Sequence, residues 1–227
     1  MLEITPRTKV TRLPYRQVTQ RSVLYDVLDA GLIAHVALCR DGLPLVLPVG
    51  YARDRDRLLI HGSTGGGLLR AAAAGAPIAV GVTLVDGLVF ARSIFDSSMN
   101  YRSVVVFGRA TAVPAEAKPA ALRLISERLM PGRWDEVRPP TGKELAATLV
   151  LDLPLDEASV KIRTGPPSEE DPPEPALPGR PRAWAGVLPL RTVVDDPVGA
   201  PDVEPGTEEP GSLATTRRRV DELNARE

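Results

Sequence analysis

The chain has 227 residues, of which 28 are Lys or Arg and 29 are Asp or Glu, so its formal net charge at pH 7 is −1. This balance argues against a nucleic-acid partner, because surfaces that bind nucleic acid carry a clear excess of positive charge. The single cysteine, Cys39, excludes a disulfide within the chain and any cysteine-cluster metal site, and it fits a reducing cytoplasm.

The first predicted elements are a helix and a group of short strands. Residues 20–30 (QRSVLYDVLDA) space their apolar side chains for a helix, and Gly31 follows as a stop. Residues 68–74 (LLRAAAA) predict a second helix, which ends at Gly75. Runs rich in Val, Ile and Leu between these helices predict strands at 32–39, 43–52 and 57–62.

The segment 71–91 is apolar enough to imitate a membrane span. An internal proline and the central pair Asp86-Gly87 suit a hairpin far better than one long helix. We therefore predict strands at 77–85 and 88–95, joined by a tight turn at Asp86-Gly87, and no membrane partner.

The second half of the barrel region continues the strand pattern. Residues 115–130 carry apolar side chains at helical spacing, and Pro119 places the helix start near Lys118. The further predicted strands cover residues 103–113, 148–155 and 158–163. Because hairpin-type turns link most strands, the sequence predicts a mainly β fold, an antiparallel barrel of at least six strands with few short helices.

Composition divides the chain into a barrel domain and appendages. Stretches rich in Pro, Gly, Asp and Glu after Thr164 have little to bury and read as disordered, although the last residues could form a frayed charged helix. The expected parts are an N-terminal arm (1–19), the barrel domain (20–163), a disordered linker (164–183), an apolar segment that docks back on the barrel (184–194) and a disordered tail (195–227).

The segment 61–70 (HGSTGGGLLR) has the glycine spacing of a nucleotide-binding P-loop. Leu68 and Leu69 stand where such a loop needs Lys and Ser or Thr, so a nucleotide triphosphatase is not expected. Backbone N–H groups with the hydroxyls of Ser63 and Thr64 would suit a single phosphate instead. A flexible turn with no ligand explains the same residues equally well.

A second polar cluster precedes the strand that begins near residue 103. Asn100, Tyr101, Arg102 and Ser103 would stand at the mouth of an apolar barrel, where a flat amphipathic ligand could bind; a strand that merely begins in a polar loop is the alternative. His35 is expected to pack or face a dimer partner rather than bind metal, and Cys39 to pack in the core. No catalytic acid, base or nucleophile stands out.

Together these segments resemble the FMN-binding split-barrel superfamily, specifically the pyridoxamine 5′-phosphate oxidase-like proteins related to nitroimidazole-resistance proteins. The resemblance implies an antiparallel six-stranded split β-barrel with flanking short helices, FMN as cofactor, a small-molecule substrate, and a homodimer with the flavin at its interface. The matching segments are residues 43–54, 58–75, 82–110 and 129–147, continued by 156–167 and 184–190.

The resemblance also implies which residues contact FMN. The strand matching Val46–Gly50 would lie along the flavin ring, the turn matching His61–Arg70 would hold the phosphate, and Ser103 would contact the ring edge. The residues expected to bind the cofactor are Pro48, Val49, Gly50, His61, Gly62, Ser63, Thr64, Gly67, Leu68, Arg70, Ser98, Asn100, Tyr101, Arg102 and Ser103.

The phosphate turn departs from the family pattern. Gly67 and Leu68 occupy the positions of the family's basic residues, and Arg70, on the same helical face as Gly67, is expected to reach back in their place. The leading hypothesis is an FMN-dependent oxidoreductase, pyridoxamine 5′-phosphate oxidase-like or nitroreductase-like, that works by flavin hydride transfer. The alternative is a non-catalytic binding protein that has lost FMN or holds haem or a deazaflavin.

Overall fold

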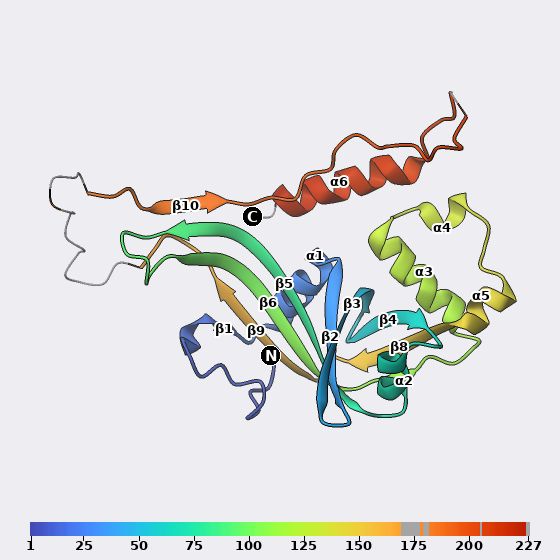
Figure 1. Cartoon of the computed structure of the whole chain (residues 1–227), viewed down its shortest axis with the longest axis horizontal. Helices are drawn as coiled ribbons and strands as arrows, with labels where there is room; N and C mark the ends of the chain where they lie inside the picture. The colour runs from blue at the N-terminus through green and yellow to red at the C-terminus, as the bar shows by residue number, and fades with distance from the viewer. Residues whose placement is uncertain (169–177, 179–181, 205, 226–227) are drawn as a thin grey trace.

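A computed structural model of the chain describes residues 1–168, 178, 182–204 and 206–225. Within these residues, ten strands form one antiparallel sheet, which confirms the predicted split barrel with few helices (Figure 1). The strands run in the order β1-β9-β6-β5-β2-β3-β4-β8-β7, and β10 pairs with β5. The strand count exceeds the predicted six, because short strands add to the edges of the barrel.

The barrel itself consists of the longer strands. These are β2 (Ile33–Arg40), β3 (Leu43–Asp54), β4 (Arg57–Ser63), β5 (Pro77–Phe90), β6 (Ser98–Arg109), β8 (Thr148–Pro154) and β9 (Glu157–Arg163). The short strands are β1 (Gln17–Val18), β7 (Thr111–Ala112) and β10 (Gly186–Pro189). The helices are a 3₁₀ turn (Pro14–Arg16), α1 (Arg21–Ala30), α2 (Gly67–Ala73), α3 (Lys118–Leu129), α4 (Arg133–Glu136), α5 (Gly142–Ala147) and α6 (Gly211–Ala225).

The barrel core follows from the alternation of side chains along each strand. On β2, Ala34, Val36 and Leu38 are buried, whereas His35 and Cys39 point outward and are exposed. The prediction that Cys39 packs in the core is therefore wrong. Cys39 lies on the same outward side of β2 as His35.

Tyr51 joins the first helix to the barrel wall. Its side chain is fully buried, and its hydroxyl donates a hydrogen bond of 2.6 Å to the carbonyl of Leu28 in α1. Burial raises the pKa of Tyr51, so the hydroxyl stays protonated and remains a donor. The bond satisfies a carbonyl in the last turn of α1, which has no partner within the helix.

The predicted hairpin turn at Asp86-Gly87 is wrong. β5 runs straight through this pair with only a local shift of register, and the hairpin instead joins β5 to β6. The carboxylate of Asp86 pairs with Arg102 at 2.7 Å rather than shaping a turn. A Cβ on Gly87 would lie 3.0 Å from the carbonyl oxygen of Leu188, so this glycine allows β10 to approach β5 closely.

The chain ends pack on the barrel. In the N-terminal arm, Leu2 is buried and β1 pairs with β9. The segment 184–194 forms β10 on the edge of β5. Of the predicted disordered linker, residues 169–177 and 179–181 lie outside the described residues. No helix in the described part of the chain is long and apolar enough to cross a membrane.

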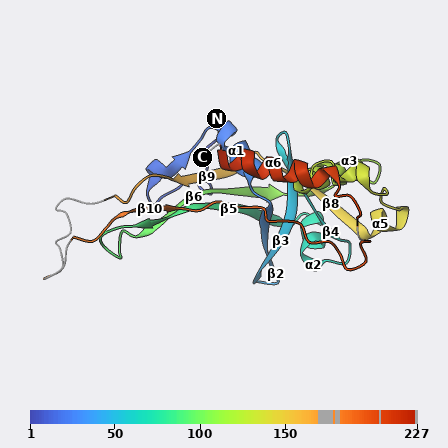
Figure 2. The same ribbon diagram turned by 90° about the horizontal axis from the view of Figure 1, so that it is seen from above.

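The C-terminal region differs from the predicted disordered tail, because it contains the long helix α6. This helix starts beside α4 and runs to the vicinity of α1 (Figures 1 and 2). Glu136 of α4 accepts hydrogen bonds from the backbone and the hydroxyl of Ser212, at 2.9 and 2.6 Å. At mid-helix, Arg219 donates to the carbonyl of Arg128 at the end of α3. These contacts hold a helix that composition alone marks as solvated.

Replacing Tyr51 by Phe should lower the free energy of unfolding by about 1–2 kcal/mol, because the Leu28 carbonyl loses its buried donor. Chemical denaturation measures the change. Tyr15→Phe is the matched control. Tyr15 is 74% exposed, so loss of its hydroxyl should leave the free energy of unfolding unchanged. Equal effects of the two substitutions would contradict the role given to the Tyr51 hydroxyl.

Candidate functional site

The register of the sheet brings several predicted ligand residues onto one outer face. Pro48 lies opposite His35, and His35 lies opposite Gly81. Two residues further along β5, Thr83 lies opposite Ser103. Directly paired residues of an antiparallel sheet point to the same side, so Pro48 and Ser103 belong to one surface with His35 and Thr83. We call this surface the outer face; Gly50, opposite Ile33, extends it.

The outer face has open space at Gly81. A Cβ on Gly81 would meet no atom within 4 Å. Val49, by contrast, points inward and is 8% exposed, so only its backbone faces this surface. The strand parity therefore separates Pro48 and Gly50, whose positions suit a ring contact, from Val49, whose side chain belongs to the core.

The remaining polar residues of β6 are used within the chain. Asn100 is buried and accepts a hydrogen bond from Arg163, while its amide donates to the carbonyl of Gly165. Arg102 forms its ion pair with Asp86. Ser98 pairs with Val89 toward the far end of the hairpin, away from the outer face formed by β2 and β3. The structure thus places Ser98 and Asn100 apart from Pro48, and Tyr101 beside Arg163 in the sheet.

The glycine turn between β4 and α2 satisfies much of its own hydrogen bonding. The backbone N–H of Thr64 donates to the carbonyl of Ala147 and that of Gly66 to the carbonyl of Ser63, both at 2.9 Å. The N–H of Gly65 donates to the Ser63 hydroxyl oxygen, and the Thr64 hydroxyl also donates to Ala147. The N–H groups of Thr64, Gly65 and Gly66 are therefore already engaged.

A cation does lie at this turn, but it comes from another hairpin. A Cβ on Gly67 would lie 2.7 Å from Nη1 of Arg40, at the end of β2. The absence of a side chain at Gly67 thus makes room for a guanidinium where the family has its own basic residue. Arg70 is exposed on α2. Arg40 was not visible from the sequence, because it lies far from the turn along the chain.

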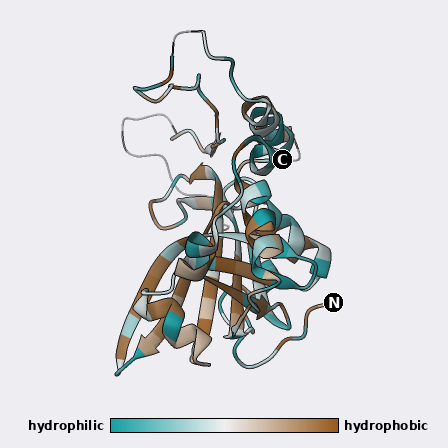
Figure 3. Cartoon of the chain, turned by 90° about the vertical axis from the view of Figure 1, so that its right-hand side faces the viewer, coloured by the Kyte–Doolittle hydropathy of each residue, from teal (hydrophilic) through white to brown (hydrophobic). Residues whose placement is uncertain are grey.

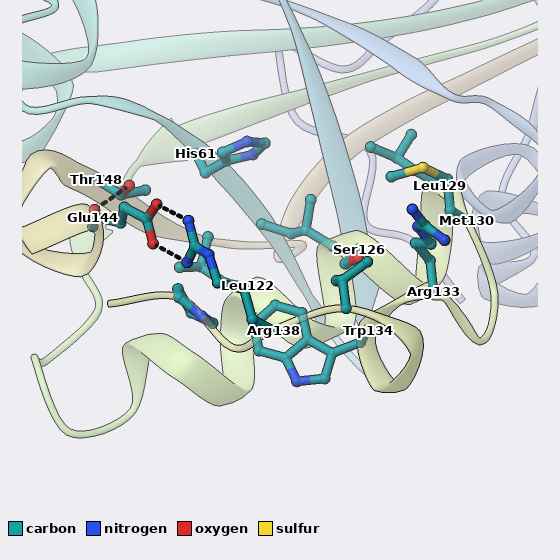
Figure 4. A pocket seen from close by; sticks show the side chains of 13 residues that line it. His61, Leu122, Ser126, Leu129, Met130, Arg133, Trp134, Arg138, Glu144 and Thr148 are labelled. Atoms are coloured by element: carbon teal, nitrogen blue, oxygen red, sulfur yellow. Dashed lines mark hydrogen bonds and ion pairs between the residues drawn. The ribbon is translucent and has the colours of Figure 1, made fainter. Parts of the chain in front are cut away.

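His61 lies in a different surrounding from the turn that follows it. It lines a cavity of about 680 Å³ between β4 and helices α3 to α5, which we call the helix cavity (Figure 4). Leu122, Ile125 and Leu129 of α3 form an apolar wall. The indole of Trp134 stands on the side opposite His61 in Figure 4. A single imidazole therefore faces a large, mainly apolar space.

The His61 ring is held in its neutral form. Burial lowers its pKa, and the nearby backbone of Gly50 has a smaller, opposite effect. Nδ1 is buried and has no hydrogen-bond partner of normal geometry among the described residues. Neutral imidazole is the form that binds metal ions, so His61 is suited to that role.

The rim of the helix cavity is charged. Arg138 and Glu144 form a two-pronged ion pair at 2.7 and 2.9 Å. The contact with Arg138, helped by hydrogen bonds from Thr141, lowers the pKa of the Glu144 carboxyl to about 2. Arg133 reaches Glu136 at 3.4 Å. Two guanidinium groups thus stand at the entrance of an apolar space (Figure 4).

A second cavity lies at the edge of β5. This strand pairs with β2 through Ala79–Gly81 and with β10 through Gly87–Phe90, and between these pairings its edge is open. A cavity of about 540 Å³ lies here, covered by α6; we call it the edge cavity. His35 and Thr83 of the outer face line it, and Leu129 lines both cavities.

Sequence reasoning missed the walls of both cavities. The walls come from α3, α4 and α6, whose side chains carry no motif and meet the barrel only after folding. The available signal was the helical spacing of apolar residues at 115–130.

The chain is similar to a known family and to solved structures. The family described as pyridoxamine 5′-phosphate oxidase matches residues 20–162. No curated protein matches the chain. A Mycobacterium smegmatis structure, described as an FAD and haem binding protein, is 45% identical with a TM-score of 0.82; the alignment covers 89% of this chain and 97% of that one.

Two further structures are similar. The flavocytochrome Anf3 from Azotobacter vinelandii is 35% identical, with a TM-score of 0.84 over 93% of this chain and 96% of that chain. A putative 5-nitroimidazole antibiotic resistance protein from Bacteroides thetaiotaomicron is 17% identical, with a TM-score of 0.54 over 64% and 86% of the two chains. This last similarity concerns the fold alone.

Proposed function

The chain belongs to the pyridoxamine 5′-phosphate oxidase family, and from this premise we propose that it is a redox protein that binds a flavin and a haem. The observation that carries the proposal is His61, a half-buried neutral imidazole facing a large apolar cavity. The two relatives above 30% identity are described as an FAD and haem binding protein and as a flavocytochrome, which supports the same pair of cofactors.

The helix cavity fits a haem. A haem needs an axial ligand, an apolar slot for the macrocycle and cations for its propionates. His61 offers a ligand, because its imidazole lines the cavity and burial favours the neutral form of the ring. Leu122, Leu129 and Trp134 offer the slot, and the guanidinium groups at the rim offer positive charge. Haem was one of the alternative ligands considered in the sequence analysis, and we propose His61 as the residue that would bind it.

The outer face fits the ring of a flavin. The open space at Gly81, the backbone near Pro48 and the Thr83 hydroxyl match an apolar ring with polar edges. The Ser103 hydroxyl donates to the carbonyl of Lys161 at 3.1 Å, so toward a ligand it would act as an acceptor. FAD has more support than the predicted FMN, because the name of the M. smegmatis relative includes FAD. The glycine turn with Arg40 and Arg70 stays a prediction for the phosphate, and the edge cavity offers a second set of cations.

The proposed reaction class is electron transfer involving a small-molecule substrate. A bound flavin exchanges hydride or single electrons, and a bound haem exchanges single electrons. The protein's contribution is to hold the two sites close together: one side chain, Leu129, contacts both cavities. No residue is assigned as a catalytic acid or base, and a cytoplasmic location stays a prediction.

We also propose that the chain forms a homodimer through the outer face. Ile33, Val46 and Phe90 are 50%, 63% and 45% exposed on β2, β3 and β5. Figure 3 shows that the strands consist mainly of apolar residues, whereas the helices are mainly hydrophilic. Apolar side chains spread over neighbouring strands are typical of a surface that a partner covers. A second copy on this face would also shield the flavin ring from water.

His61→Ala should abolish haem binding, because the chain then lacks the proposed axial ligand. The measurement is the Soret absorbance of protein reconstituted with haem, together with flavin content. His35→Ala is the matched control, since His35 is the chain's other histidine and lies on the outer face. An unchanged Soret band in His61→Ala, or its loss only in His35→Ala, would contradict the assignment.

Val46→Glu should convert the dimer to a monomer, because it places a charge in the centre of the proposed interface. Light scattering coupled to size-exclusion chromatography gives the mass in solution. Val198→Glu is the control, since Val198 is 95% exposed on the C-terminal segment and outside the barrel strands. A monomeric native protein would refute the proposed dimer.

A further inference from the structure

The edge cavity has an excess of uncompensated positive charge. Arg128 of α3, Arg191 after β10 and Arg219 of α6 line it, and none of the three forms an ion pair with a described residue. Asp86, an acid in the lining, is already paired with Arg102. A cavity of this composition attracts a ligand with several negative charges.

Arg128 is the most confined of these cations. It is 7% exposed, and its Nη2 donates to the backbone carbonyls of Asp29 and Gly31. Its Nε and Nη1 are buried and have no hydrogen-bond partner among the described residues. A buried guanidinium with two unpartnered nitrogens is costly, and an anion in the cavity would offset that cost.

Arg219 completes the pair from the covering helix. Its Nη1 donates to the carbonyl of Arg128 at 2.7 Å, so the two arginines meet at the end of α3. Burial lowers the pKa of Arg219, and Asp29 and Glu222 act in the opposite direction. The contact brings a guanidinium from α6 to the end of α3, where it adds positive charge to the cavity that Arg128 also lines.

The rest of the cavity is apolar and opens toward the outer face. Val85 of β5 and Val220 and Leu223 of α6 line it, and His35 connects it with the face proposed for the flavin ring. The ligand class must therefore combine flat apolar groups with a compact, multiply charged group. Dinucleotides joined by a diphosphate have this composition.

We propose that the edge cavity binds the diphosphate of a dinucleotide, with Arg128 and Arg219 as its main ligands and Arg191 at the entrance. This inference rests on the proposed function where the dinucleotide is the flavin itself. The same chemistry is present in a nicotinamide dinucleotide that would deliver electrons to the flavin. In either case the principal phosphate site would be the edge cavity and not the glycine turn, where the N–H groups of Thr64, Gly65 and Gly66 are already bonded.

The test uses ADP as the probe of the diphosphate site, with the full-length protein freed of bound cofactors and calorimetry as the readout. ADP should bind, and Arg219→Ala should weaken it roughly 10- to 100-fold, the range expected for losing one charge-assisted hydrogen bond. Arg218→Ala is the matched control on the same helix, since Arg218 is exposed and does not line the cavity. Arg191→Ala provides a second cavity variant at an exposed position, so the test does not depend on α6 staying docked.

Competition experiments identify the source of the diphosphate. If FAD displaces ADP, and Arg219→Ala weakens FAD roughly 10-fold or more but leaves FMN unchanged, the occupant is the flavin. If FMN-loaded protein still binds ADP, and NADH or NADPH displaces it, the occupant is the nicotinamide dinucleotide. A general distortion by the substitution would weaken FMN and FAD equally, and that result would overturn the assigned role.

Two further results would overturn the inference. One is ADP binding that neither Arg219→Ala nor Arg191→Ala weakens. The other is ADP binding that depends on Arg40 and Arg70 at the glycine turn. These outcomes are distinct from failure of the proposed function, which would appear as absence of both flavin and haem binding whatever the behaviour of ADP.

Discussion

The change of partner along one edge of β5 is the constraint on which the edge cavity and its cover depend. Over Ala79–Gly81 this edge bonds to β2, and over Gly87–Phe90 it bonds to β10. An edge strand left open exposes backbone donors and acceptors, which natural proteins cover or pair. Here the C-terminal region does both, since β10 pairs with part of the edge and α6 covers the gap. A barrel closed along this edge would have no room for a ligand beside the outer face.

Helix α3 carries the second half of the arrangement. Its apolar residues face the helix cavity, its last turn faces the edge cavity, and Leu129 contacts both. The helix packs on β3 and β4 through Ala121 and Ile125, which are 5% and 2% exposed. Because this packing fixes α3 on the barrel, the distance between the two cavities is a property of the core rather than of the surface loops. Two redox groups held on either side of such a helix would keep a constant separation.

Much of the barrel could be predicted because strand alternation is a local property. The parity of β2 and β3 places Pro48 and Gly50 on the outer face, and the same rule would have shown that the Val49 side chain points inward and that Cys39 is exposed. The predicted turn at Asp86-Gly87 was wrong for a different reason. Asp86 pairs with Arg102 and Gly87 lies against β10, and both contacts depend on residues distant in sequence. Arg40 beside Gly67 was hidden for the same reason. Arg40 places a guanidinium beside Gly67, where the family has a basic residue, and no spacing along the chain could reveal this contact.

The contact between Glu136 and Ser212 connects the walls of the two cavities. Glu136 belongs to the short helix α4, whose Arg133 and Trp134 line the helix cavity, while Ser212 begins the helix that covers the edge cavity. Any displacement of α4 must either carry α6 with it or break both hydrogen bonds. One carboxylate thus joins the helix that borders the first cavity to the helix that covers the second.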